Sequence, residues 1–272
     1  MLWSLHGHQY AVNLDKFYHI SIPLRFNESQ ANHFGAPLAK SEPLRGEGFI
    51  GDTRQGGSCN VDYLKMIPHC NGTHTECLGH IVDPSYDVHS SLVDAWIPTV
   101  LLSVRPRLAA DTIESYMPQK DLEDRLICRE DLERALKIVD RKDWPGLLVR
   151  TLPNDEKKKN CIYGTQEQAS FFSLEAMEFI EQMKVQHLLV DAPSIDRMYD
   201  DGLLNNHHFF WHIDPKDKGK IEPWQWQKTI TEMVYVENQI EDGLYCLNLQ
   251  IAPFSNSDAS PSRPILFPME MQ

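Results

Sequence analysis

The sequence is short of positive charge. It contains 26 lysine and arginine residues against 39 aspartate and glutamate residues, so its formal net charge at pH 7 is −13. A chain of this sign repels the phosphates of nucleic acids and anionic membrane surfaces. We therefore expect neither nucleic acid nor a membrane as a partner, and we expect a small-molecule substrate instead.

Long hydrophobic runs and paired cysteines are also missing. No apolar stretch approaches the roughly 20 residues that a membrane-spanning helix needs. The opening MLWSLHGHQY has neither the basic start nor the apolar stretch of an export signal. The 6 cysteines are scattered without a CxxC pair, which indicates reduced thiols in a chain of this length. These absences predict a soluble, cytoplasmic protein.

The sequence does contain enough apolar residues for a sizeable core. Hydrophobic residues make up 42% of the 272 residues and charged residues 24%, as in ordinary globular proteins. There is no internal repeat, low-complexity tract or linker, so we expect a single domain over residues 1–272. Because helical and strand patterns alternate along the chain, we expect an α/β fold around a core sheet.

Apolar periodicity places the expected elements. Helical spacing covers residues 130–139 and 174–184, with Ser173 as a candidate N-cap of the second helix. Asp242–Gly243 is a turn signal between two late strands. Strands are predicted at residues 19–24, 95–104, 146–150, 187–191, 229–236 and 244–251.

The densest group of potential metal ligands lies in residues 69–80, HCNGTHTECLGH. In an extended strand, residues two apart point the same way, so His74 and Glu76 would share one face. Imidazole and carboxylate ligands suit zinc, manganese or iron, and a thiolate would favour zinc. The alternative is three loop histidines that make ordinary hydrogen bonds.

Several motifs occur in the order of a known family. Residues 71–80, NGTHTECLGH, are similar to the signature HxGTHxDxPxH, and residues 191–196, DAPSID, are similar to DxPSxD. Asn206-His207, Thr231-Glu232 and the closing run at 259–264 follow in the same order. Together these motifs resemble those of the metal-dependent cyclase family, which includes bacterial-type kynurenine formamidase and isatin hydrolase.

The resemblance implies a fold and a site. The fold is of the swivelling β/β/α type, with a central barrel-like mixed β-sheet and flanking helices, in a homodimer or homotetramer. The site holds one or two divalent metal ions, with zinc expected first and manganese second. His80 matches the histidine that the family uses as general acid and base. Carried over residue by residue, the metal ligands are His69, His74, Glu76, His207 and Glu232.

The chain departs from the family signature at its start. In strict register the first signature histidine falls on Cys70, and His69 is displaced by one position. In a regular strand this shift turns a side chain to the opposite face, so His69 serves only if a bulge re-aims it. We choose His69, with Cys70 as the alternative. Glu76 replaces the family aspartate, and Leu78 replaces a proline.

Two further choices concern carboxylates. Asp191, Ser194 and Asp196 are candidates to orient metal-bound histidines, and turn capping is the alternative for each. The family's spacing back from Gly-x-Tyr at residues 243–245 selects Glu232 rather than Glu237 as the late ligand. Strand alternation would place Glu232 on one face with Ile230 and Val234.

These observations predict a metal-dependent hydrolase. We expect it to cleave an amide, formamide or lactam C–N bond of a small aromatic or cyclic substrate, like an arylformamidase, with water activated by the metal. One alternative is a cyclase or dehydratase that uses the same metal site. The other is a metal-binding protein that has lost turnover.

Overall fold

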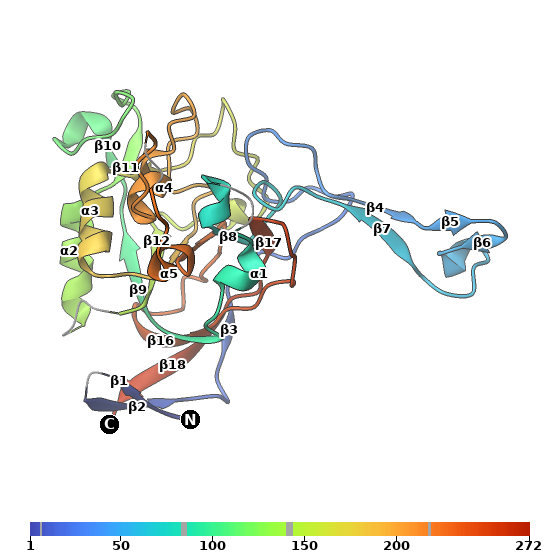
Figure 1. Cartoon of the computed structure of the whole chain (residues 1–272), viewed down its shortest axis with the longest axis horizontal. Coiled ribbons are helices and arrows are strands. Elements are labelled where there is room, and N and C mark those ends of the chain that lie inside the picture. Colours follow the sequence, from blue (N-terminus) through green and yellow to red (C-terminus); the bar gives the residue numbers. More distant parts are fainter. Residues whose placement is uncertain (6, 83–85, 140–143, 217–218) are drawn as a thin grey trace.

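A computed structural model describes residues 1–5, 7–82, 86–139, 144–216 and 219–272 (Figure 1). Within these ranges most strands belong to one mixed sheet of 11 strands, in the order β1-β2-β18-β16-β9-β12-β14-β15-β8-β17, with β3 paired to β18 off this path. Three smaller sheets are β10-β11-β13, β4-β7 and β5-β6.

The bounds of the elements are as follows. The strands are β1 (Leu2–Leu5), β2 (His8–Val12), β3 (Tyr18–His19), β4 (Lys40–Pro43), β5 (Arg45–Gly46), β6 (Phe49–Ile50), β7 (Asp62–Lys65), β8 (His74–Cys77), β9 (Trp96–Val104), β10 (Arg107–Leu108), β11 (Arg125–Ile127), β12 (Gly146–Thr151), β13 (Phe171–Phe172), β14 (His187–Val190), β15 (Thr229–Glu232), β16 (Gly243–Asn248), β17 (Ala259–Pro261) and β18 (Ile265–Met271). The α-helices are α1 (Val88–Ser91), α2 (Arg129–Ala135), α3 (Leu174–Gln182), α4 (Asn205–Phe210) and α5 (Pro223–Trp226).

The centre of the large sheet is parallel. β9, β12, β14 and β15 run in the same direction, so their carboxyl ends meet at one edge. β8 runs antiparallel to β15, and the register pairs His74 at the start of β8 with Glu232 at the end of β15. The same edge therefore carries both the ends of the parallel strands and the first residue of β8.

The segment after β3 closes the sheet into a barrel-like form. β3 pairs with β18, and Ser21 then bridges Val234, beyond the end of β15. The Tyr235 amide also donates a hydrogen bond of 2.7 Å to the Ile20 carbonyl. β18 and the segment just beyond β15, the third and eighth strands of the path, are thus joined, and the predicted barrel-like mixed sheet is confirmed.

Alternate strand residues build two cores. Inside the barrel lies a cluster that includes Ile97, Leu101, Leu148, Leu189 and Leu247. Their strand neighbours face outward and pack in a second cluster with the helices, which includes Val100, Leu147, Leu188, Leu132 of α2 and Ile180 of α3. The flanking helices α2 and α3 lie side by side along one side of the sheet (Figure 1).

The predicted helices and buried strands are confirmed. α2 begins one residue before its predicted start, and a 3₁₀ turn, Leu136–Ile138, follows it. At the start of α3, the Ser173 hydroxyl accepts a hydrogen bond of 3.0 Å from the Ala176 amide, as a capping residue does. The strands predicted at 95–104, 146–150 and 187–191 correspond to β9, β12 and β14.

The late strands differ from expectation. Residues 229–236 do not form one strand, because β15 ends at Glu232 and Met233 has a φ of +52°, which breaks the alternation. Ile230 packs outside the barrel, and Val234, beyond the break, packs inside it. The prediction that Ile230, Glu232 and Val234 all share one face was therefore wrong. β15 and β16 are not neighbours in the sheet, and Asp242–Gly243 does not connect a hairpin.

Residues 40–65 form an arm that projects from the body (Figure 1). It contains the strand pairs β4-β7 and β5-β6, and most of its residues are exposed or half-buried. Among the helices that the structure describes, none has the length and apolar character required to span a bilayer.

Candidate metal centre

Four segments bring the predicted ligands together at the carboxyl edge of the sheet. His74 and Glu76 lie on β8, Glu232 ends β15, and His207 lies on α4. The 3₁₀ turn Leu78–His80 directly follows β8 and carries His80 back toward these side chains. Glycine at position 72 suits the turn before β8, because its φ of +74° is disfavoured for residues with a side chain.

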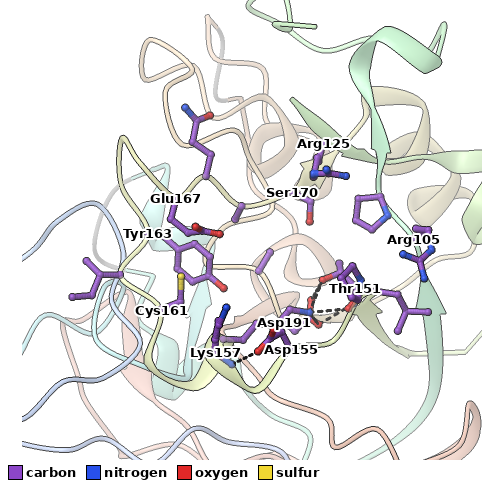
Figure 2. A pocket seen from close by; sticks show the side chains of 18 of the residues that line it. Arg105, Arg125, Thr151, Asp155, Lys157, Cys161, Tyr163, Glu167, Ser170 and Asp191 are labelled. Atoms are coloured by element: carbon purple, nitrogen blue, oxygen red, sulfur yellow. Dashed lines mark hydrogen bonds and ion pairs between the residues drawn. The ribbon is translucent and has the colours of Figure 1, made fainter. Parts of the chain in front are cut away.

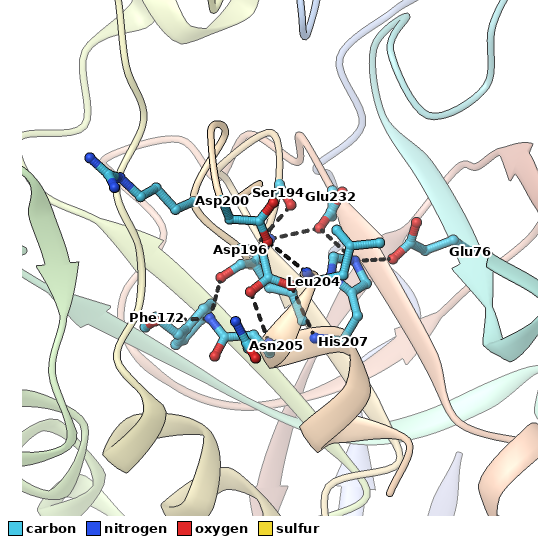
Figure 3. Close-up of polar contacts among 12 residues, drawn as sticks. Glu76, Phe172, Ser194, Asp196, Asp200, Leu204, Asn205, His207 and Glu232 are labelled. Carbon is cyan, nitrogen blue, oxygen red and sulfur yellow. Dashed lines mark hydrogen bonds and ion pairs between the residues drawn. The ribbon is translucent and has the colours of Figure 1, made fainter. Parts of the chain in front are cut away.

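His207 is held between two carboxylates (Figure 3). Its Nδ1 donates to Asp196 Oδ2 at 2.5 Å, and its Nε2 lies 2.8 Å from Glu76 Oε1 and 4.0 Å from Glu232 Oε1. Burial opposes a charge on this ring, but Glu76 and Asp196 prevail and raise the pKa of His207 well above its usual value. Carboxylate oxygens thus lie within hydrogen-bond distance of both nitrogens of the ring.

Asp196 also fixes the start of α4. Its two carboxylate oxygens accept hydrogen bonds from the backbone amides of Asn206 (2.8 Å) and His207 (3.1 Å), and one accepts the Tyr116 hydroxyl at 2.6 Å. The prediction that Asp196 orients a histidine agrees with this geometry. Ser194 instead accepts from the Asp196 amide at 3.1 Å, which is a turn contact.

His74 offers one ring nitrogen as a ligand for a cation. Its Nδ1 donates to the Gly72 carbonyl at 3.1 Å, which leaves the lone pair on Nε2. Nε2 is buried, has no hydrogen-bond partner among the residues that the structure describes, and lies 3.4 Å from Glu232 Oε2. A lone pair that faces a carboxylate oxygen in a dry environment is unfavourable unless a cation lies between them.

Glu76 and Glu232 are both buried carboxylates. Glu76 is 1% exposed, and its Oε2 lies 2.9 Å from His69 Nδ1. Burial disfavours its charge, but His80 and His207 hold the pKa of Glu76 well below its usual value. Glu232 is 3% exposed, and its Oε1 accepts a hydrogen bond of 2.8 Å from the Ile195 amide. These carboxylates need positive partners at this depth.

Asp258 belongs to the same cluster and was missed by the sequence analysis. Its Oδ2 lies 2.7 Å from His69 Nε2 and 3.1 Å from His80 Nδ1, and these contacts hold the pKa of Asp258 well below its usual value. Asp258 directly precedes β17, which pairs with β8 and so brings it beside Glu76. The one available signal was its position just before the closing family motif.

The choice between His69 and Cys70 depends on local backbone. Both residues lie in a turn that precedes β8 rather than in a strand, so the strand-face argument does not apply to them. The structure places His69 against Glu76 and Asp258; burial opposes its charge, but these contacts raise the pKa of His69 to about 10. Among the described residues, Cys70 belongs to no group with metal-ligand spacing, whereas His69 does.

Two other carboxylates lie elsewhere. Asp191 accepts from the Thr151 amide and hydroxyl, both at 2.9 Å, and pairs with Lys158 Nζ at 2.8 Å, so it does not orient a site histidine. Glu237 is half-exposed and pairs with Lys159 at 2.8 Å. All six predicted site residues, including His80, therefore converge, and these two do not join them.

The donor set fits a divalent metal ion. Ligand atoms of His69, His74 and Glu76 lie within 4.8 Å of one another, as do those of Glu76, His80 and His207. Imidazole nitrogens and carboxylate oxygens are typical ligands of zinc and of manganese. The unpartnered Nε2 of His74 and the two buried glutamates are the features that such an ion would satisfy.

Comparison with known proteins identifies the family of this chain. The family model described as "Putative cyclase" matches residues 18–197, about two thirds of the chain. The chain therefore belongs to the cyclase family. A search of curated proteins gave no match.

Solved structures share the fold. Isatin hydrolase A from Labrenzia aggregata, bound to benzyl benzoate, is 13% identical, with 93% of each chain covered and a TM-score of 0.60. A predicted metal-dependent hydrolase from Bacillus stearothermophilus is 15% identical, with 93% of this chain and 98% of that chain covered and a TM-score of 0.57. At these identities the likeness establishes the fold.

Proposed function

We propose that this protein is a metal-dependent hydrolase that cleaves an amide, formamide or lactam C–N bond in a small substrate, like an arylformamidase. The observation that carries the proposal is the buried convergence of His74, Glu76, His207 and Glu232 around an unpartnered imidazole nitrogen. Membership of the cyclase family and the shared fold of isatin hydrolase A support it.

The ligand roles follow from the free atoms. His74 Nε2, His207 Nε2, Glu76 and Glu232 would hold the ion, with His69 as a further ligand. Zinc is our first choice and manganese the second. When bound, such an ion polarises a carbonyl group and lowers the pKa of a water molecule toward neutrality. Asp196 and the Gly72 carbonyl fix the two inner rings through Nδ1.

His80 is the proposed proton carrier. Its contact with Asp258 uses Nδ1 and leaves Nε2 for proton transfer, and its side chain is partly exposed at the mouth of the cluster. In hydrolysis, His80 takes a proton from the attacking water and donates it to the nitrogen that leaves. Asp258 holds the ring in the required orientation.

The substrate region is proposed from a neighbouring cavity. A cavity of about 350 Å³ is lined by His33, Phe34, Ser194 and Tyr199 among others, and Ser194 precedes the residue whose amide binds Glu232. The Phe34 and Tyr199 rings lie 5.7 Å apart, which favours an aromatic or cyclic substrate. Burial and then His74 lower the pKa of His33 to about 4, so the His33 ring is uncharged at pH 7.

Metal analysis of the purified protein, coupled to a substrate panel, tests the proposal. The panel contains N-formyl arylamines, lactams and cyclic imides. We expect about one or two divalent ions per chain, and hydrolysis that chelation abolishes and added metal restores. Bound metal without hydrolysis of any panel member would instead favour the metal-binding alternative. Protein that stays metal-free after exposure to zinc and manganese would refute the site.

A further inference from the structure

A second cavity of about 890 Å³ lies at the carboxyl ends of β9, β12 and β14 (Figure 2). Residues at or just beyond the ends of these strands, such as Arg105, Leu152 and Asp191, line it. It shares no lining residue with the smaller cavity beside the metal centre. Crevices at the carboxyl ends of parallel strands are the usual place for ligands in α/β proteins, and this volume is within the range of ligand pockets.

Among the described residues, the cavity is lined by four positive side chains and three carboxylates: Arg105, Arg125, Lys157 and Lys158, and Asp155, Glu167 and Asp191. Within the residues that the structure describes, Arg105, Arg125 and Lys157 form no ion pair. Asp124, next to Arg125 in the chain, pairs with Arg197 at 3.1 Å instead. The lining therefore carries one more cation than carboxylate, although the protein as a whole has a net charge of −13.

The floor of the cavity is polar but electrically balanced. Asp191 is buried, and its carboxylate pairs with Lys158 at 2.8 Å while it accepts two hydrogen bonds from Thr151. Lys158 thus already balances the negative charge of Asp191. Asp191 therefore does not cancel the positive electrostatic potential of Arg105, Arg125 and Lys157. The same contacts hold the floor in one geometry.

The two sides of the cavity differ in charge. Figure 2 shows Arg105, Arg125 and Ser170 on one side, and Glu167 with Tyr163 on the other. Arg125 and Ser170 are near each other because β11 and β13 pair with Leu126 opposite Phe171. A hydroxyl group therefore lies beside the guanidinium groups.

We propose that this cavity binds a small organic anion that carries a phosphate or carboxylate group, at a site separate from the metal centre. Arg105 and Arg125 offer planar donor groups that match either oxyanion, whereas Lys157, beside Asp155 in Figure 2, adds positive charge on the other side of the cavity. The Ser170 hydroxyl donates a hydrogen bond to the same group. Glu167 faces the part of the ligand that is not anionic.

Calorimetric titration tests the site with inorganic phosphate and with succinate, which separate the two possible anionic groups. The purified protein binds at least one probe, and the affinity falls as sodium chloride rises, because salt screens the attraction. In Arg105→Gln/Arg125→Gln/Lys157→Gln the affinity falls at least tenfold. The control Arg25→Gln/Arg45→Gln/Lys65→Gln also removes two arginines and one lysine, at exposed positions outside the cavity. It binds the probe as the unmodified protein does.

Two single variants locate the binding. Glu167→Gln removes a negative charge that repels the anionic probe, so it strengthens binding about twofold or more. Misfolding would weaken binding instead. Glu232→Gln, in the metal centre, leaves probe binding unchanged. The proposal is overturned if neither probe binds the unmodified protein, if both triple variants weaken binding alike, or if Glu232→Gln abolishes it.

Discussion

Glu232 and Glu237 lie five positions apart in the chain, yet their surroundings are opposite. Glu232 is buried against His74, whereas Glu237 is half-exposed beside Lys159. We predict that Glu232→Gln sharply lowers the metal content and abolishes activity, because it removes a charged ligand. Glu237→Gln leaves both close to those of the unmodified protein. Bound metal, measured in the two purified variants, checks this, and metal loss in the Glu237 variant alone would refute the ligand assignment.

Variants of Asp258 test whether this residue orients His80 or binds the metal. In Asp258→Asn the partner of His80 Nδ1 loses its charge, so we predict that kcat falls about 10- to 100-fold while KM and metal content change little. Asp258→Glu restores part of the activity because the carboxylate is kept. His80→Asn, which removes the proton carrier itself, costs about 100- to 10,000-fold in turnover.

Steady-state kinetics and metal analysis of these three variants check the prediction. Loss of metal in step with loss of kcat in Asp258→Asn would make Asp258 a ligand rather than an orienting residue.

Most of the site could be predicted from the sequence because its residues lie within short motifs. His74 and Glu76 are two apart on β8, and that spacing alone predicts a shared face. Asp258 was not accessible, since its role depends on the pairing of β17 with β8. The position of His69 depends on a turn whose backbone path no strand pattern describes.

At the scale of elements, β8 and β15 carry the ligands and must keep their register. Thr75 on β8 and Thr231 on β15 are fully buried, and their hydroxyl oxygens lie 2.8 Å apart. We predict that either single change to valine lowers the free energy of unfolding by about 1–3 kcal/mol, because it leaves one buried hydroxyl unpaired. In the double variant the loss of unfolding free energy is smaller than the sum of the two single losses.

Urea unfolding of the four proteins gives this coupling free energy directly. Additive losses in the double variant would show that the two hydroxyls do not depend on each other.

The elements that the sequence predicted best are those with continuous apolar patterns. β9, β12 and β14 are buried on both faces, and α3 carries its apolar stripe of Met177, Ile180 and Met183 into the core. The strand predicted at 229–236 failed because Met233 adopts a positive φ, which a methionine does not signal. Asp242 looked like a hairpin residue, but its carboxylate binds Ser103 and Arg150 instead.

For the molecule as a whole, we predict that bound metal stabilises the folded chain against unfolding. Glu76 and Glu232 are buried carboxylates whose charge an ion would balance. With free metal at 100 times its dissociation constant, binding adds about 2.7 kcal/mol to the free energy of unfolding, which corresponds to a rise in Tm of about 5–10 °C. Thermal unfolding with and without zinc or manganese measures the shift. Glu232→Gln serves as the control and shows a smaller one.

Most residues of the arm at 40–65 are exposed or half-buried. Two-stranded ribbons are marginal in water on their own, yet this one exposes Leu44, Tyr63 and Leu64 by 46%, 57% and 50%. A second copy of the chain can cover these side chains by a symmetric exchange of arms, because an isologous contact uses the same surface twice. We propose that the arm forms the contact between chains in the homodimer or homotetramer that the family resemblance implies.

We predict that the unmodified protein has a mass of two or four chains and that Tyr63→Glu/Leu64→Glu reduces it to a monomer of about 31.4 kDa, because charges in a closed apolar contact are strongly unfavourable. Light scattering after size-exclusion chromatography measures the mass. The control Ile113→Glu/Leu122→Glu changes two even more exposed apolar residues outside the arm and keeps the mass at two or four chains. An unmodified protein that is already monomeric, or an arm variant that stays assembled, would show that the arm is not the interface.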